Sequence, residues 1–284
     1  MRDGPVKAAG ILDLPEITLI EPSFSALTED IYTEALLGIP ATGARLLVDP
    51  GEDPLAVAVT DGEEWYAASF LFREPPREVI ELCEDLDGEI HEAGRSLWLT
   101  AVREYYSLLL AGSVTPALEA LPPDRLPALL DLLGELWDRG EGVSCLDRCC
   151  GSGAGSAAAR SLGMLPLAYD NDPALLSLGL STGRLLPGET MWIDATAATR
   201  YIDPVPRGIA VMMGEINAFT GELWEGIASE FLALAGDALI TVGTEAEARR
   251  VEAWCRDAGR RAGVTENPRH AFYDRWVCRS QKMG

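Results

Sequence analysis

The spacing of apolar residues along this chain changes in character near residue 143. Upstream, short β-branched or aromatic runs are separated by turn-forming stretches such as 49–53, which predicts a hairpin accompanied by helices. The strands expected there are 45–48, 54–60 and 64–72, and the helices expected are 77–86, 96–110 and 126–138. We therefore predict a small α/β N-terminal domain at 1–95, followed by a helical linker or cover at 96–142.

From residue 143 onward, strand and helix signals alternate, which is typical of a parallel sheet covered by helices on both faces. The strands expected are 143–147, 165–170, 190–193, 209–213 and 238–242, and the helices expected are 157–162, 173–180, 223–235 and 245–259. The alternation stops near the end, where 265–270 and 273–279 have strand patterns with no helix between them. Residues 143–284 are therefore predicted to form an α/β domain whose mainly parallel sheet ends in an antiparallel hairpin.

A glycine-rich turn joins the first of these strands to its helix. Its sequence is Asp147-Arg148-Cys149-Cys150-Gly151-Ser152-Gly153-Ala154-Gly155-Ser156. Glycine lets a backbone approach a ligand closely, and the free N–H groups at the start of the next helix point toward that ligand. The position between a strand and a helix favours a nucleotide site, and the absence of a following GK[ST] excludes a phosphate-cradling P-loop.

Three carboxylates fall at the ends of successive predicted strands: Asp147, Asp170 and Asp194. Because the carboxyl ends of parallel strands line one crevice, we expect these acids to converge. Asp170 can accept hydrogen bonds from two vicinal ribose hydroxyls, and Asp194 can accept one from an adenine amino group. The coincidence of three acids with three successive strand ends strengthens the prediction of a nucleotide site.

These residues resemble the class I S-adenosylmethionine-dependent methyltransferase superfamily, whose first motif runs acid, any, Gly, any, Gly, any, Gly. Residues 147–153 follow the motif except at Cys149, which stands where the first glycine usually lies. Over about 97–279, the resemblance implies a Rossmann-like fold and S-adenosyl-L-methionine as cofactor, with Asp170 on the ribose and Asp194 on the adenine. The cofactor-binding residues that we expect are Asp147, Cys149, Cys150, Gly151, Ser152, Gly153, Asp170, Asn171, Asp194, Ala195 and Gly214.

The methyl acceptor is expected beside the end of the fourth predicted strand, at 213–217. Superfamily members that methylate amide or exocyclic base nitrogens often carry Asn/Asp-Pro-Pro-aromatic there, and this sequence does not. Glu215 is our candidate catalytic residue, either accepting a proton or binding a cationic substrate, and Asn217 is a second candidate. Glu215 could equally be a surface acid at the start of a loop.

Charge narrows the choice of partners. The 284 residues carry a formal net charge of −22, and such a surface repels phosphate backbones. We therefore expect a small-molecule or protein acceptor rather than nucleic acid. The acidity itself fits an ordinary solvated surface, with a basic partner as the alternative; the oligomeric state is left open.

Other residue types point to no additional chemistry. The six cysteines contain no CxxC pair, so we expect reduced packing residues rather than a metal site. His91 and His270 have no neighbouring acid or nucleophile pattern and are expected to be structural or surface residues, the latter on the strand 265–270. No apolar stretch of membrane-spanning length and no signal-peptide pattern is present, which predicts a cytoplasmic protein without a membrane partner.

Two alternatives of other classes stay open. Gly151, Gly153 and Ser156 fit the dinucleotide pattern G-x-G-x-x-G only with serine in the last place, which keeps an NAD-dependent oxidoreductase as one alternative. The other is a methyltransferase-like fold that binds a nucleotide without catalysis, as an assembly or regulatory subunit.

Overall fold

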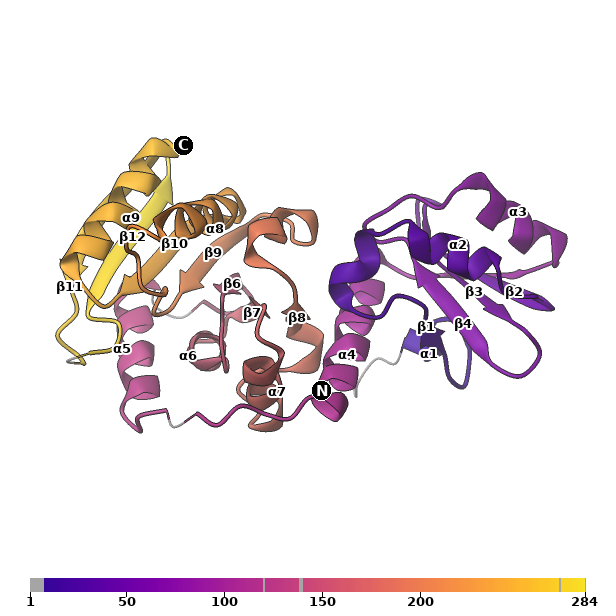
Figure 1. Ribbon diagram of the computed structural model, residues 1–284, viewed down its shortest axis with the longest axis horizontal. Helices are drawn as coiled ribbons and strands as arrows, with labels where there is room; N and C mark the ends of the chain where they lie inside the picture. Colours follow the sequence, from indigo (N-terminus) through magenta and orange to yellow (C-terminus); the bar gives the residue numbers. More distant parts are fainter. Residues whose placement is uncertain (1–7, 120, 138–139, 271, 284) are drawn as a thin grey trace. The chain divides into compact units, whose positions relative to one another are not determined.

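The protein is described from a computed structural model, which defines residues 8–119, 121–137, 140–270 and 272–283. The chain divides into two compact units, Met1–Leu109 and Leu110–Gly284. We call them the N-terminal and the C-terminal unit. The boundary falls within helix α4 (Arg95–Ser113). Each unit contains its own β-sheet (Figure 1).

A five-stranded sheet with the order β1-β4-β3-β2-β5 forms the N-terminal unit. Its strands are β1 (Thr18–Leu19), β2 (Gly43–Val48), β3 (Pro54–Thr60), β4 (Trp65–Ser69) and β5 (Glu89–Glu92). The predicted hairpin is confirmed, because β2 and β3 pair antiparallel, and β4 extends it on the other side of β3. The helices, besides α4, are α1 (Ala8–Ile11), α2 (Ile31–Leu37), α3 (Arg77–Asp85) and the 3-10 segment η1 (Phe24–Thr28).

The C-terminal unit contains a seven-stranded sheet with the order β11-β12-β10-β9-β6-β7-β8. Its strands are β6 (Ser144–Arg148), β7 (Leu165–Asp170), β8 (Thr190–Trp192), β9 (Val205–Ala210), β10 (Ala235–Val242), β11 (Arg260–Glu266) and β12 (Trp276–Lys282). The five strands from β8 to β10 are parallel, and β12 runs antiparallel to both of its neighbours. Numbered within this sheet, the order is 3-2-1-4-5-7-6. The predicted Rossmann-like sheet with a closing antiparallel hairpin is confirmed.

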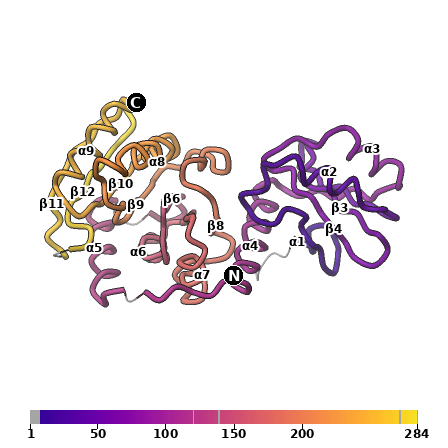
Figure 2. The backbone as a smooth tube through the Cα atoms, in the orientation of Figure 1, coloured from indigo at the N-terminus to yellow at the C-terminus, as the bar shows by residue number. Residues whose placement is uncertain are grey.

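Helices cover both faces of this sheet (Figure 1 and Figure 2). One face carries α5 (Arg125–Trp137), α6 (Ala154–Ser161) and α7 (Pro173–Ser181), and the other carries η3 (Ala195–Arg200), α8 (Gly221–Leu234) and α9 (Glu245–Asp257). The short segment η2 (Pro187–Glu189) precedes β8. On the first face, Leu133 of α5 and Ala158 of α6 share one core cluster with Cys145, Ile209 and Leu239 of the sheet.

Three predicted strands are displaced in the structure. The strand expected at 209–213 ends at Ala210, because Met212 has a φ of 55° and the chain leaves the sheet there. The hairpin strands expected at 265–270 and 273–279 begin and end elsewhere, as β11 and β12. Pro268 has no N–H to continue the ladder, so His270 lies in the connecting segment and not on a strand.

The predicted helix 126–138 corresponds to α5, and its last position lies outside the described residues. No helix within the described ranges has both the length and the apolar character that a membrane span requires.

Candidate functional site

The turn between β6 and α6 is built from residues with left-handed backbone conformations. The φ angles are 48° at Cys149, 53° at Gly151 and 83° at Gly153. Glycine adopts such angles without steric cost, whereas Cys149 does so as a residue with a Cβ. Gly153 is also packed tightly, because a Cβ there would lie 2.6 Å from the side chain of Leu185. The backbone conformation of the turn therefore favours glycine at positions 151 and 153.

Asp170, the last residue of β7, fixes this turn. Its Oδ2 accepts a hydrogen bond from the N–H of Gly151 at 2.8 Å, and its Oδ1 accepts one from the N–H of Asp172 at 2.9 Å. Burial raises the pKa of the Asp170 carboxyl, and these backbone hydrogen bonds oppose the rise. The carboxylate is thus held in one orientation at the carboxyl end of its strand, with lone pairs left for a ligand.

Asp147 lies beneath the turn. It is 1% exposed, and its Oδ2 accepts a hydrogen bond from Ser156 Oγ at 2.6 Å. No described residue donates a hydrogen bond to its Oδ1. Burial raises the pKa of Asp147 to about 7, despite the hydrogen bond from Ser156. A Cβ at Gly155 would come within 2.9 Å of both carboxylate oxygens, so glycine is required above this acid.

A cleft of about 660 Å³ opens at the carboxyl ends of the parallel strands. Nine of the expected cofactor-binding residues line it: Cys149, Cys150, Gly151, Ser152, Asp170, Asn171, Asp194, Ala195 and Gly214. Asp147 and Gly153 are not among its lining residues, because the first is buried under the turn and the second packs on Leu185. The sequence prediction that these strand ends share one crevice is confirmed for Asp170 and Asp194.

Asp194 follows β8 and begins η3. Its Oδ1 accepts hydrogen bonds from the N–H of Thr196 at 2.8 Å and from Thr196 Oγ1 at 2.7 Å. This N-cap holds the carboxylate at the rim of the cleft, where it is exposed to solvent.

Two walls of the cleft were not predicted from the sequence. Glu119 and Arg125 contribute from the segment before β6, and Leu223, Trp224 and Ile227 contribute from α8. The apolar spacing 223, 224, 227 at the start of a helix after the fourth strand is the signal that could have found the α8 wall. For Glu119 and Arg125 no local pattern indicates the position, because the chain folds them back over the later turn.

The candidate catalytic residues Glu215 and Asn217 lie between β9 and α8, and neither is among the residues that line the cleft. Asn217 Oδ1 accepts hydrogen bonds from the N–H groups of Phe219 at 2.8 Å and Thr220 at 3.2 Å, so this side chain shapes the loop. The Glu215 side chain is exposed, and its backbone carbonyl accepts a hydrogen bond from Thr220 Oγ1 at 2.6 Å.

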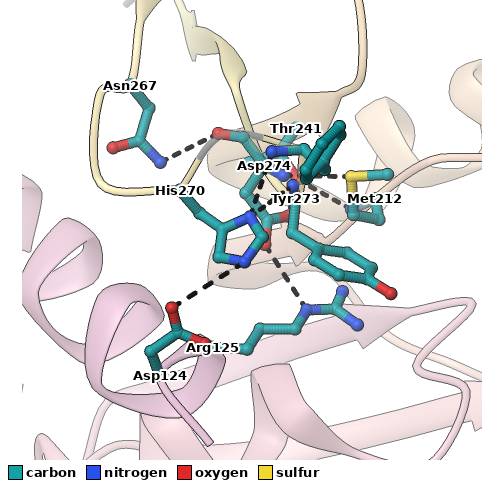
Figure 3. A network of polar contacts seen from close by, with 9 residues as sticks. Asp124, Arg125, Met212, Thr241, Asn267, His270, Tyr273 and Asp274 are labelled. Atoms are coloured by element: carbon teal, nitrogen blue, oxygen red, sulfur yellow. Dashed lines mark hydrogen bonds and ion pairs between the residues drawn. The ribbon is translucent and has the colours of Figure 1, made fainter. Parts of the chain in front are cut away.

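A polar network joins the start of α5 to the connection between β11 and β12 (Figure 3). Thr241 Oγ1 donates a hydrogen bond to Asp274 Oδ1 at 2.5 Å, and the N–H of Asp274 contacts Met212 Sδ at 3.0 Å. Arg125 Nε lies 3.6 Å from Asp274 Oδ2, and Arg125 Cζ lies 4.5 Å from the ring centroid of Tyr273. Through Arg125, this network reaches the cleft.

His270 shapes the same connection. Its Nδ1 accepts hydrogen bonds from the N–H groups of Phe272 at 3.1 Å and Tyr273 at 2.9 Å. We assign the neutral tautomer with the proton on Nε2, because Nδ1 is the acceptor. Nε2 lies 3.9 Å from Asp124 Oδ2 (Figure 3). His270 therefore has a structural role here.

All six cysteines are free thiols. Burial raises the pKa of both Cys149 and Cys150, so the two thiols in the cleft stay protonated at neutral pH. Within the part of the chain that the structure describes, no group of three or more His, Cys, Asp or Glu side chains is arranged to hold a metal ion.

The strand order and the glycine-rich turn give the C-terminal unit the class I methyltransferase fold, a Rossmann-like fold. No protein-family model and no curated protein sequence matches the chain. Similar solved structures include a candidate RNA methyltransferase from Pyrococcus horikoshii, with 16% identity and a TM-score of 0.45 over 64% of this chain and 96% of the other. Magnesium protoporphyrin IX methyltransferase from Synechocystis PCC 6803, with bound S-adenosylmethionine, has 14% identity and a TM-score of 0.45 over 65% and 97%.

A third similar structure is precorrin-6y C5,15-methyltransferase from Geobacter metallireducens, with 13% identity and a TM-score of 0.43 over 61% and 95%. Structural similarity at such low sequence identity does not identify the methyl acceptor of this chain. Our expectation that the acceptor is not a nucleic acid gains no support from it, since one of these proteins is a candidate RNA methyltransferase.

Proposed function

We propose that the C-terminal unit binds S-adenosylmethionine in the cleft and transfers its methyl group to an acceptor. The observation that carries this proposal is the placement of Asp170 and Asp194 on one cleft beside the glycine-rich turn. Asp170 ends β7 and Asp194 follows the neighbouring strand β8, and neighbouring strands lie roughly 4.8 Å apart. That separation suits a ribose and its adenine bound side by side.

The residues present fit this cofactor in charge as well as in shape. Glu119, Asp170, Asp172 and Asp194 line the cleft, and their negative charge suits a sulfonium and an ammonium group. The turn at Gly151 allows a ligand to approach the backbone closely.

S-adenosylmethionine supplies an activated methyl group. The chain therefore has mainly to hold the cofactor, align the acceptor with the methyl group and exclude water. Asp170 and Asp194 would hold the adenosine. Leu223, Trp224 and Ile227 form an apolar wall, and Trp224 packs directly on Gly214, where a Cβ would lie 2.3 Å from Trp224 Cζ2. This wall would keep water from one side of the bound cofactor.

Glu215 and Asn217 are retained in this proposal as acceptor-side residues. The loop that carries them begins at Gly214, which lines the cleft. Asn217 would act by positioning, since its side chain organises the loop. Glu215 offers an exposed carboxylate that makes no hydrogen bond to another described residue of the loop.

Calorimetric titration of the purified full chain with S-adenosylmethionine, S-adenosylhomocysteine and NADH tests the cofactor. We expect micromolar binding of the first two, lost in Asp170→Ala and retained in Asp257→Ala, an exposed acid at the end of α9. Circular dichroism should show both variants folded. Binding of NADH alone would favour the oxidoreductase alternative, and binding of none of the three would contradict the proposed cofactor.

A second candidate function is nucleotide binding without catalysis. It is favoured by one observation, that neither Glu215 nor Asn217 lines the cleft. Incubation with methyl-labelled S-adenosylmethionine and separate small-molecule, protein and RNA fractions distinguishes the two functions. Methyl transfer to any fraction supports catalysis, and tight cofactor binding without transfer to any of them supports the non-catalytic alternative.

A further inference from the structure

The N-terminal unit contains a cavity of about 480 Å³ against helix α4. One wall is a face of α4, and the rest of the lining comes from residues 8–9 and 15–17. Every residue of the lining precedes Leu110, so the cavity belongs to this unit alone. Small-molecule sites in proteins occupy roughly 300–1,000 Å³, and the cavity is therefore large enough for a ligand.

Helical spacing produces the α4 wall. Ala101, Glu104, Tyr105 and Leu108 recur at intervals of three and four residues, which places their side chains on one face of the helix. Ala101 is 1% exposed and Glu104 is 9% exposed, whereas Leu108 is 53% exposed. The cavity is thus closed toward Ala101 and Glu104 and opens to solvent toward Leu108.

The lining of this cavity is mainly apolar. Ala8, Ala9 and Ile17 are buried and line the cavity from outside α4. The apolar residues of the lining that stay open to solvent are Pro15, Leu108 and Leu109. An apolar group that enters the cavity would release water from these surfaces, which favours binding.

The two charged residues of the lining are both acids. Glu104 is largely buried and Glu16 is exposed, and none of the described residues that line the cavity is Lys, Arg or His. A carboxylate ligand would therefore be repelled, and a cation would be attracted. Because solvent is largely excluded at Glu104, this attraction is stronger there than beside a carboxylate in open water.

Tyr105 adds a fixed aromatic ring next to Glu104. Its Oη accepts a hydrogen bond from the N–H of Leu19 at 3.2 Å, and its ring meets the Tyr106 ring edge-on with 5.2 Å between centroids. These two contacts orient the ring before a ligand binds, which reduces the entropy lost on binding. The negative charge on the face of an aromatic ring also favours an ammonium group.

A second cavity of about 330 Å³ adjoins the first, because Pro15, Glu16 and Ile17 line both. It adds Glu63 and Glu64, which directly precede β4. Among the residues that the structure describes in its lining there is again no Lys, Arg or His. The negative charge at Glu16 therefore continues into the neighbouring cavity, so that neither cavity offers a counterion to an anionic ligand.

We propose that the cavity against α4 binds a small organic cation, with its ammonium group beside Glu104 and its apolar body against Ile17 and Leu108. A protein segment fits less well, because the exposed apolar surface of the lining is limited to three side chains, too little for a stable protein interface. This site is lined by other residues than the cleft of the C-terminal unit, and it does not depend on the proposed function.

Ligand-observed NMR titration of the full chain tests the charge that the cavity selects. Hexylamine, hexanol and hexanoate share a six-carbon chain and differ in the head group. We expect saturable binding of hexylamine, at least about tenfold tighter than that of hexanol, and no saturable binding of hexanoate. Hexanoate binding as tight as hexylamine binding would overturn the proposal, as would the absence of saturable hexylamine binding.

A pair of glutamate variants locates the ammonium group. Glu104→Gln keeps the size of the side chain and removes its charge, so it should weaken hexylamine by about tenfold and hexanol by less than about twofold. Glu84→Gln is the matched control, because it removes one negative charge from an exposed position on α3 outside the lining. It should change neither ligand. Circular dichroism should show both variants folded.

A pair of leucine variants locates the apolar body, and it decides the site even if Glu104→Gln fails to fold. Leu108→Ser should weaken hexylamine and hexanol alike, by about threefold or more. Leu97→Ser is the matched control, because Leu97 is 44% exposed on the same helix and does not line the cavity. Hexylamine affinity that is unchanged in both Glu104→Gln and Leu108→Ser would overturn the proposal, because the cation would then bind elsewhere through the net charge of −22.

Discussion

Ser156 Oγ donates a 2.6 Å hydrogen bond to Asp147 Oδ2, and both residues are buried beneath the glycine-rich turn. The contact joins the end of β6 to the first turns of α6. Ser156 thus supports the charged form of Asp147, but burial outweighs this support and raises the pKa of Asp147 to about 7. The acid at the head of the turn is therefore a point of pH-dependent stability.

Asp147→Asn tests this consequence. A carboxyl whose folded pKa is raised favours folding below its unfolded pKa, near 4, and loses that contribution as pH rises through about 7. The free energy of unfolding of the wild-type chain should therefore fall more than that of Asp147→Asn between pH 4 and 8, by roughly 2–4 kcal/mol. Urea denaturation across this range measures the difference. Parallel profiles for the two proteins would show that Asp147 titrates normally.

A second prediction concerns Arg148, which is 0% exposed. No described residue accepts a hydrogen bond from its guanidinium, which lies 5.6 Å from the Trp224 ring centroid and 5.5 Å from that of Phe231. Cation–π contact contributes about 1–2 kcal/mol, less than the desolvation of a buried charge. We expect Arg148→Met to match or exceed wild-type stability by up to about 1 kcal/mol, and Arg148→Ala to lose about 3 kcal/mol through its cavity. If chemical denaturation shows that Arg148→Met loses as much stability as Arg148→Ala, the guanidinium has a partner in the folded protein.

Gly153 should be the least replaceable glycine of the turn. Gly153→Ala adds a Cβ at a φ of 83° and 2.6 Å from Leu185. Gly142→Ala is the matched control, because Gly142 has a φ of 74° but nothing within 4 Å of the added Cβ. We expect a loss of about 1 kcal/mol at 142, from backbone strain alone, and roughly 2–4 kcal/mol at 153, where overpacking adds to it. Equal losses of stability in Gly153→Ala and Gly142→Ala, measured by thermal or urea denaturation, would show that the Leu185 side chain moves aside without an energetic cost.

The sequence predicted the sheet of the C-terminal unit well because its strands are short apolar runs separated by helix signals. Asp170 and Asp194 could be placed on one crevice since parallel strands share a carboxyl edge. The end of β9 was misplaced because apolar residues continue through Met213, while Met212 turns the chain out of the sheet. The closing hairpin was displaced because its register depends on pairing between β11 and β12, which no local pattern records.

The positions of side chains that tertiary folding brings to the site could not be predicted from the sequence. Arg125 lies 22 residues before Asp147 in the sequence. Its place in the cleft depends on a contact with Asp274, which lies far downstream in the sequence. Trp224 could be assigned to a helix, but not to a cleft wall, since its packing on Gly214 is a contact between a loop and a helix face. Asp147 was expected to contact the cofactor, and its burial under Gly155 follows from how α6 packs on β6.

Glu215→Gln tests the proposed acceptor side, once an acceptor has been identified by methyl transfer. If Glu215 removes a proton from the acceptor, turnover should fall at least tenfold, because general-base catalysis contributes roughly 10²–10⁴-fold. Affinity for S-adenosylhomocysteine should stay unchanged, since Glu215 does not line the cleft. Glu222→Gln is the matched control, an exposed acid in the first turn of α8. Asn217→Ala should act differently and raise KM for the acceptor, because it removes the hydrogen bonds that order the loop. Turnover at the wild-type rate in Glu215→Gln, measured in single-turnover reactions, would show that Glu215 does not remove the proton. Methyl transfer would then depend on the alignment of the acceptor and on the reactivity of the cofactor.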